Sequence, residues 1–271
     1  MEIKQVTKKV DKLRFTLQGV DVSLANALRR TMISEVPSMA IEEVFIAENT
    51  SILFDEIIAH RLGLIPLKTD LDSYVLREEC TCQGAGCSRC QVSFYLDRTA
   101  ENDVETILSG DLKSDDSNTI PVSPDIPITK MTRGQKLSLE AYARLGIGKE
   151  HAKWEPVSAC FYKYMPVVEV DRRKCNLCEN CISVCPKNIF KKEKDKIILQ
   201  NVEDCILCHE CVKKCDPEAI TISYDKNKLL YTVESTGVLP PERILEEALK
   251  ILNKKASDLL NQISGKIEVT K

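Results

Sequence analysis

The sequence CNLCENCISVCP at residues 175–186 is followed by CILCHECVKKCDP at residues 205–217, and these two runs decide part of the fold. Each cysteine of the second run lies 30 residues after its counterpart in the first. The spacing C-x2-C-x2-C-x3-C is that of bacterial ferredoxins, in which the fourth cysteine of one run binds the cluster of the other run. We therefore expect a ferredoxin-like repeat that can hold two [4Fe–4S] clusters.

The two predicted clusters draw their ligands from both runs. The first would use Cys175, Cys178, Cys181 and Cys215, and the second would use Cys205, Cys208, Cys211 and Cys185. Zinc or disulfides are the alternatives. Asp216 stands between the last cysteine and Pro217, so the geometry near Cys215 could differ. One cluster could then be absent or degraded to [3Fe–4S]. We expect His209 to be exposed and not to be a ligand.

The composition of the chain limits its class. A length of 271 residues allows two or three domains, and 29% charged with 43% hydrophobic residues is typical of a soluble globular protein. With a net charge of −3 the chain as a whole has no excess positive charge to attract phosphates, so we expect no direct sequence-specific binding of nucleic acid. No apolar run is long enough to span a membrane, and the first residues lack a signal peptide. Thirteen cysteines then indicate metal binding in the reducing cytoplasm.

A second cysteine cluster lies earlier in the chain. It places four thiols within eleven residues: Cys80, Cys82, Cys87 and Cys90. Gly84 and Gly86 would let the loop between them bend. Four cysteines favour a closed, structural zinc site, with free or oxidised thiols as the alternative. Cys160 stands alone on an apolar segment, where we expect it to be a small buried core residue.

The hydrophobic pattern predicts elements around these cysteines. Helices are expected at 22–36, with Leu24, Leu28 and Met32 at four-residue steps, and at 54–62. Pro37 should end the first helix. Strands are expected at 13–17, 41–47, 92–96, 160–170 and 229–233, and a loop at 114–127.

A long helix is predicted at 242–263, with Pro241 in its first turn. Its apolar positions follow steps of four and three residues: Leu245, Leu249, Leu252, Ala256, Leu259 and Ile263. This is a heptad seam, which favours packing against a helix of another subunit. Packing on the chain's own sheet is the alternative.

No catalytic motif accompanies these features. The three histidines form no triad, and the sequence has no phosphate-binding loop, dinucleotide fingerprint or nucleophile elbow. Arg29 and Arg30 could pair with carboxylates of a partner or form a solvated helix face. The chain is therefore not expected to be an enzyme by itself.

Several longer segments resemble a known family. They are LANALRRTMISE with VPSMAIEEVFIAENTS at 24–51, HRLGLIPL at 60–67 and GKEHAKWEPVSAC at 148–160. Together with the ferredoxin-like repeat they resemble the α-like, third-largest subunits of DNA-directed RNA polymerases, in their archaeal form. The resemblance covers nearly the whole chain. The cysteine loop at 80–90 aligns with a zinc-binding loop of the eukaryotic relatives.

The resemblance implies an α+β scaffold for transcription rather than a catalyst. A dimerisation domain of a sheet and two helices would be split between residues 1–47 and 222–271. A mixed α/β domain at 48–165 and the two-cluster ferredoxin-like domain at 166–221 would be inserted in it.

The same resemblance implies the partners. The chain would form a heterodimer with the small L subunit and would then join subunits N and P and the large catalytic subunits. The interface residues would be the heptad positions above with Leu24, Leu28, Arg29, Arg30 and Met32. A two-cluster ferredoxin-like electron-transfer protein is the alternative function.

Overall fold

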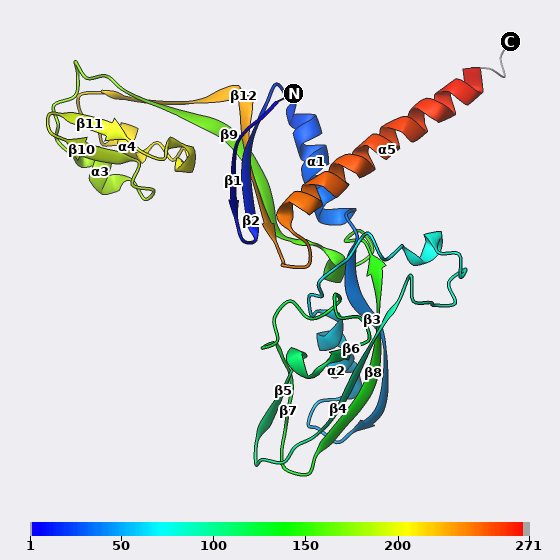
Figure 1. The fold of residues 1–271 in the computed structure, drawn as a ribbon. Helices are drawn as coiled ribbons and strands as arrows, with labels where there is room; N and C mark the ends of the chain where they lie inside the picture. Colours follow the sequence, from blue (N-terminus) through cyan, green and yellow to red (C-terminus); the bar gives the residue numbers. More distant parts are fainter. Residues whose placement is uncertain (1, 268–271) are drawn as a thin grey trace. The chain divides into compact units, whose positions relative to one another are not determined.

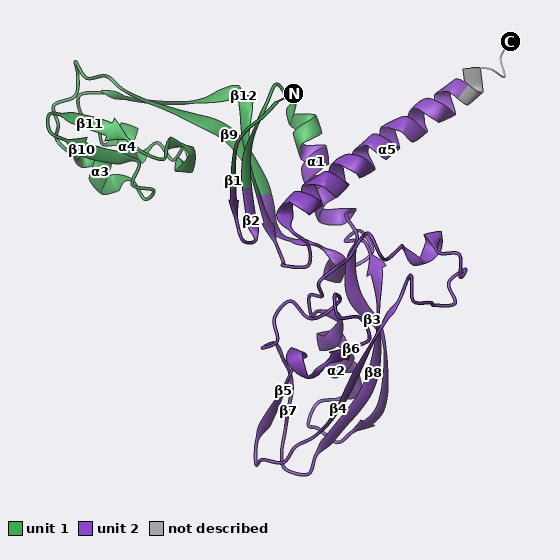
Figure 2. Cartoon of the chain, viewed as in Figure 1, with its two compact units in different colours: residues 1–7, 14–25, 161–232 green, residues 8–13, 26–160, 233–271 purple. Residues whose placement is uncertain are grey.

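The computed structural model describes residues 2–267 and orders them into strands and helices as drawn in Figure 1. The chain forms two compact units, coloured in Figure 2. The first comprises residues 1–7, 14–25 and 161–232, and the second comprises residues 8–13, 26–160 and 233–271. No helix in the described part of the chain is long and apolar enough to cross a membrane. The domain boundaries predicted above stay predictions.

A four-stranded sheet of order β1-β2-β12-β9 supplies the long strands of the first unit. Its strands are β1 (Glu2–Lys9), β2 (Lys12–Gln18), β12 (Ile220–Ser235) and β9 (Val157–Val170). Leu13, Phe15 and Leu17 are buried at alternate positions of β2, as one face of a strand requires. Phe15 stacks on Tyr231 with ring centroids 5.1 Å apart.

The cysteine repeat lies between β9 and β12 and is built from short elements. These are α3 (Asn180–Val184), β10 (Phe190–Glu193), β11 (Lys196–Leu199), the 3-10 turn η4 (Val202–Asp204) and α4 (Glu210–Lys213). β10 and β11 pair antiparallel as a hairpin. Three of the eight buried residues in this core are cysteines, namely Cys181, Cys205 and Cys211. The repeat therefore has a small apolar core that depends on its thiols.

Asp216 does not shift the frame of the repeat. Strands β10 and β12 begin at Phe190 and Ile220, which are 30 residues apart like the cysteines. The buried residues Ile189 and Ala219 precede them at the same spacing. In the sequence, Ile220 follows Cys215 by five residues whereas Ile189 follows Cys185 by four, which suggests that Asp216 is an insertion. This interpretation is wrong, because Ala219 is the structural counterpart of Ile189 and Asp216 replaces a residue without inserting one.

The second unit has its own sheet of order β3-β8-β4-β6. Its strands are β3 (Ser38–Asn49), β8 (Lys136–Gly146), β4 (Val92–Thr99) and β6 (Lys113–Ser114). A separate pair joins β5 (Glu105–Leu108) to β7 (Pro127–Met131). Helix α2 (Asp55–Gly63) adds Ile58 and Leu62 to the same core. Three 3-10 turns complete the unit: η1 (Arg77–Glu79), η2 (Ser109–Asp111) and η3 (Ala152–Trp154).

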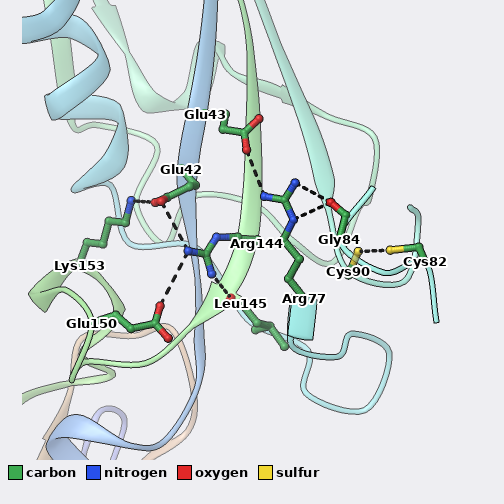
Figure 3. A network of polar contacts seen from close by, with 10 residues as sticks. All are labelled: Glu42, Glu43, Arg77, Cys82, Gly84, Cys90, Arg144, Leu145, Glu150 and Lys153. Carbon is green, nitrogen blue, oxygen red and sulfur yellow. Dashed lines mark hydrogen bonds and ion pairs between the residues drawn. The ribbon is translucent and has the colours of Figure 1, made fainter. Parts of the chain in front are cut away.

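Strand β3 carries a bulge beside β8. Its register against β8 shifts between Ile41 and Glu43. A bulge adds one residue to one strand and re-aims the neighbouring side chains. Here Glu42 and Glu43 contact different groups, as Figure 3 shows.

Two longer helices, α1 and α5, complete the described elements. α1 spans Val22–Ser34, close to the predicted 22–36, and ends before Pro37. α5 spans Pro241–Ile267 and begins at Pro241, as predicted, because a first-turn residue needs no intrahelical N–H bond. Ile244 and Ala248 near its start are completely buried. By contrast, every side chain from residue 253 to residue 264 is exposed.

Candidate functional site

The structure gathers the eight cysteines of the repeat into two groups that cross between the runs. Burial, followed by the charges of Cys185, Cys205 and Cys208, raises the pKa of the Cys211 thiol to about 11. In the other group, burial and the charges of Cys175, Cys178 and Cys215 raise the pKa of Cys181. Each group thus contains three thiols of one run and the fourth thiol of the other. The grouping agrees with the spacing, and the binding of a cluster by either group stays a prediction.

The backbone of both runs makes the same unusual turns. Leu177 and Glu179 have φ values of 63° and 65°, and Leu207 and His209 have φ values of 57° and 60°. Non-glycine residues adopt this left-handed conformation at a cost, and such residues gather at ligand-binding loops. His209 is exposed, as expected. The repeated turns indicate that each run is shaped to direct its first three thiols at one ligand.

Backbone amides also point at the sulfurs. The N–H of Leu207 donates to the Sγ of Cys205 at 3.4 Å, and the N–H of Ala219 donates to the Sγ of Cys215 at 3.3 Å. Hydrogen bonds to thiolates stabilise their charge and tune an iron–sulfur cluster. An apolar hollow lies over the second quartet and is lined by Cys185, Cys205, Cys208 and Cys211 together with Phe190 and Ile222. The donor set and its dry lining fit an iron–sulfur cluster.

In the cysteine loop of the second unit, the sulfurs lie closer together than in either quartet of the repeat. Its four sulfurs lie within 4.8 Å of one another, and no other group of three or more candidate ligands in the described part of the chain is as compact. The Cys80–Cys87, Cys82–Cys90 and Cys87–Cys90 sulfurs are 3.5, 3.6 and 3.8 Å apart. Tetrahedral zinc with bonds of 2.3 Å would place its sulfurs about 3.8 Å apart. The loop therefore has the dimensions of a site for one ion, and the wider quartets of the repeat do not.

The thiols of this loop differ in acidity. Hydrogen bonding from the Cys80 thiol lowers the pKa of Cys82 to about 6. Burial raises the pKa of Cys90 to about 12. A metal ion must replace the proton of such a buried thiol to bind it. The group therefore combines a readily ionised thiol, that of Cys82, with the thiol of Cys90, which would need a bound metal to remain a thiolate.

Two features fix the shape of the loop. Gly84 and Gly86 have φ values of +86° and +84°, a conformation that other residues rarely adopt, and this fits the bend expected there. Arg77 of η1 donates from Nε and Nη2 to the Gly84 carbonyl at 3.0 and 2.8 Å. Its Nη1 also donates to Glu43 of β3 at 3.2 Å, so one guanidinium connects the loop to the sheet (Figure 3).

A cluster of charges around Trp154 lies on the other side of the β3 bulge. Trp154 is 2% exposed, with the Arg144 guanidinium 4.6 Å and the Lys153 ammonium 4.4 Å from its ring. Glu42 forms ion pairs with both cations. Gly146 leaves room for the indole, since a Cβ there would come within 2.4 Å of it. These contacts fix the segment GKEHAKWEP against β3 and β8.

The residues expected at a subunit interface divide into two groups. Leu28 and Met32 are 3% and 0% exposed, so they belong to the chain's own core and offer no surface to a partner. The expectation for these two residues is wrong, because the chain itself covers the helix face on which their four-residue spacing places them. Leu24 and Arg30 are exposed, and Arg29 is partly exposed and donates to Asn26 at 3.2 Å.

The heptad positions of α5 become exposed along the helix. Leu245 and Leu252 are partly buried, whereas Ala256 is exposed. Leu249, Leu259 and Ile263 are 36%, 58% and 48% exposed. The chain therefore covers only the beginning of this seam.

Known proteins resemble the chain over nearly its whole length. The family model of the RNA polymerase Rpb3/Rpb11 dimerisation domain matches residues 14–256. The chain is 41% identical to the DNA-directed RNA polymerase subunit Rpo3 of Methanosphaera stadtmanae over 97% of this chain and 99% of that one. It is 43% identical to Rpo3 of Archaeoglobus fulgidus over 98% and 99% of the two chains. The chain belongs to the Rpo3 family.

Membership of the Rpo3 family extends to eukaryotic relatives and decides the general function. The chain is 35% identical to the RNA polymerase II subunit rpb3 of Dictyostelium discoideum over 97% of this chain and 95% of that one. A protein of this family is a non-catalytic assembly subunit of DNA-directed RNA polymerase. The electron-transfer alternative finds no support among these relatives, since each is named as a polymerase subunit.

Sequence reasoning missed the residues that support the candidate metal ligands. Arg77 and Lys163 contact cysteine loops across the fold, and no local motif marks either of them. Cys160 was expected to be buried, but it is only partly so. Burial nevertheless raises the pKa of its thiol to about 12.

Proposed function

We propose that this chain pairs with a small L-type subunit through α1 and α5. The heterodimer would form the platform on which subunits N and P and the large catalytic subunits assemble in the cytoplasm. The observation that carries this proposal is the long exposed stretch of α5. Residues 253–264 have no buried side chain, yet they continue the heptad seam with Leu259 and Ile263.

A partner helix would satisfy this seam. Steps of four and three residues place apolar side chains along one stripe of a helix, which packs well against a second helix. Leu260 beside the seam is also exposed, at 64%, and widens the apolar face. The family model describes a dimerisation domain and extends to residue 256, within this helix. The proposed partner is therefore a subunit that presents a complementary apolar helix.

Co-purification of the full chain with the small subunit tests the pairing. We expect the double variant Leu259→Glu with Ile263→Glu to lose the heterodimer, because two charges would be buried in an apolar seam. Ser257→Glu with Gln262→Glu is the matched control, because it adds the same charges to exposed polar positions of the same helix. Unchanged pairing of the Leu259 and Ile263 variant would overturn the proposal.

We further propose that the crossed quartets bind two [4Fe–4S] clusters and that Cys80, Cys82, Cys87 and Cys90 bind zinc. The compact sulfur cage supports zinc, and the inward amides and the apolar hollow support clusters. When bound, each centre would cross-link its loop through metal–thiolate bonds and so stabilise a region with a small core of its own. The protein itself supplies the turns, amides and cations that hold the thiols.

A role for the clusters in assembly can be separated from pairing. We expect Cys205→Ser to lower the iron content and to weaken assembly with the large subunits while leaving pairing with the small subunit intact. The control is Cys160→Ser, which alters a partly buried thiol outside both quartets. Equal loss of small-subunit pairing in Cys205→Ser would contradict a role specific to later assembly.

A further inference from the structure

Two side chains of the sheet β1-β2-β12-β9 contact the segment that begins the second cysteine run. We propose that Arg14 and Lys163 are positioning residues that fasten the quartet of Cys185, Cys205, Cys208 and Cys211 to the sheet β1-β2-β12-β9. This inference rests on the proposed binding of a cluster by that quartet. It makes the second cluster one that side chains of this sheet hold in place.

Arg14 supplies the first fastening point. It lies on β2, and its Nη1 donates to the Oδ1 of Asp204 at 2.9 Å. Asp204 ends the turn η4 and directly precedes Cys205. The side chains of the pair are 29% and 41% exposed, so water weakens their attraction but does not remove it. The contact fixes the start of the second cysteine run.

Lys163 supplies the second point. It lies on β9, is partly buried, and donates from Nζ to the carbonyl oxygen of Cys205 at 2.8 Å. That carbonyl belongs to the first peptide of the turn whose next amide, that of Leu207, donates to the Cys205 sulfur. Fixing this peptide therefore fixes the amide that faces the sulfur.

The two fastening points come from separate strands. In the sheet, β2 and β9 flank β12, which leads directly out of the second run. The Asp204–Cys205 segment is therefore tied to both neighbours of the strand that continues from it. A charged contact also lies near the first quartet, where Lys192 of β10 pairs with Glu179 at 2.5 Å. Both residues belong to the cysteine repeat itself and both side chains are well exposed, so this contact does not join the repeat to the sheet.

Release of iron to a strong chelator, measured without oxygen on the full chain with its small partner, tests the proposal. The variant is Lys163→Met with Arg14→Gln, and the matched control is Lys192→Met with Glu179→Gln. Loss of outer contacts to a metal site typically weakens it by 10–100-fold, so we expect about half of the iron to leave roughly 10-fold faster in the first variant. The control should release iron as the unmodified chain does.

Two further readouts separate the possible outcomes. In the double variant, hydrogen exchange of the backbone amides should rise at residues 205–211 and not at residues 175–181. The variant Lys163→Arg should release iron slowly, because it keeps a hydrogen-bond donor. Equal iron release by the variant and the unmodified chain would overturn the fastening role. Absence of cluster iron in the unmodified chain would instead refute the proposed cofactor, and the inference would fall with it.

Discussion

Arg77 offers the sharpest test of how the fold shapes the cysteine loop at 80–90. Its guanidinium donates twice to the Gly84 carbonyl and once to Glu43. Arg77→Met keeps much of the side-chain volume and removes all three donors. We expect the loop to remain in the chain's fold but to lose its fixed position relative to β3.

The magnitude follows from the two bonds to Gly84. The ion pair with Glu43 contributes little, because that carboxylate side chain is 59% exposed. Two hydrogen bonds from a charged donor to one partly exposed carbonyl contribute about 1–3 kcal/mol together. Since 1.4 kcal/mol is tenfold in affinity, zinc binding should weaken by about 10-fold or somewhat more.

Competition against a coloured zinc chelator measures this affinity. Arg89→Met is the matched control, because Arg89 lies in the same loop, is exposed and makes no side-chain hydrogen bond or ion pair within residues 2–267. Cys87→Ser should lose tight binding and sets the lower limit. Equal affinities for Arg77→Met and Arg89→Met would refute the reasoning that Arg77 shapes the site.

Three other predictions concern the stability of the second unit. Tyr74→Phe removes the 2.8 Å bond to Asp116 and should lower the free energy of unfolding by about 1 kcal/mol in urea titrations; no change would mean that the bond is not formed in solution. The amide of Asn118 lowers the pKa of Asp116, so this carboxylate stabilises the fold above its unfolded pKa of about 3.9, and the contribution disappears as the pH falls through its lower folded pKa. Asp116→Asn should remove that part of the acid dependence, and an unaltered acid profile would contradict this. Trp154→Ala should cost about 3–5 kcal/mol, measured by chemical unfolding, and a loss below that range would show that the cation–indole packing is weak.

Local spacing made the grouping of the cysteines predictable. A ligand set is encoded by short gaps between cysteines, and the 30-residue repeat already implies the crossing of Cys185 and Cys215. The start of α5 was equally clear, because Pro241 precedes a regular helical pattern. These features depend on neighbours in the sequence, so the chain alone reveals them.

Other strands were missed for physical reasons that differ. β8 alternates without interruption through Leu137, Leu139 and Ala141, so its sequence carries a clear strand pattern. β12 was predicted only at 229–233, because its polar first half holds its conformation by pairing with neighbouring strands and not by burying a face. The hairpin of β10 and β11 is too short and too charged for a periodic pattern.

Long-range contacts set the limit of sequence reasoning at the site. Lys163 and Cys205 are 42 residues apart, and Arg14 and Asp204 are 190 residues apart. Leu28 and Met32 show the same limit in another way, because an apolar helix face can serve the chain's own core or a partner. Only the folded chain distinguishes these alternatives.

Iron and zinc content per chain is the measurement that tests the account most directly. It should be made on the full chain purified with its small partner in the absence of oxygen. The account predicts about eight iron atoms and one zinc ion per chain, for two clusters in the crossed quartets and one ion in the cysteine loop. About four iron atoms or fewer would contradict the two-cluster account, and absence of zinc would contradict the proposed role of the loop.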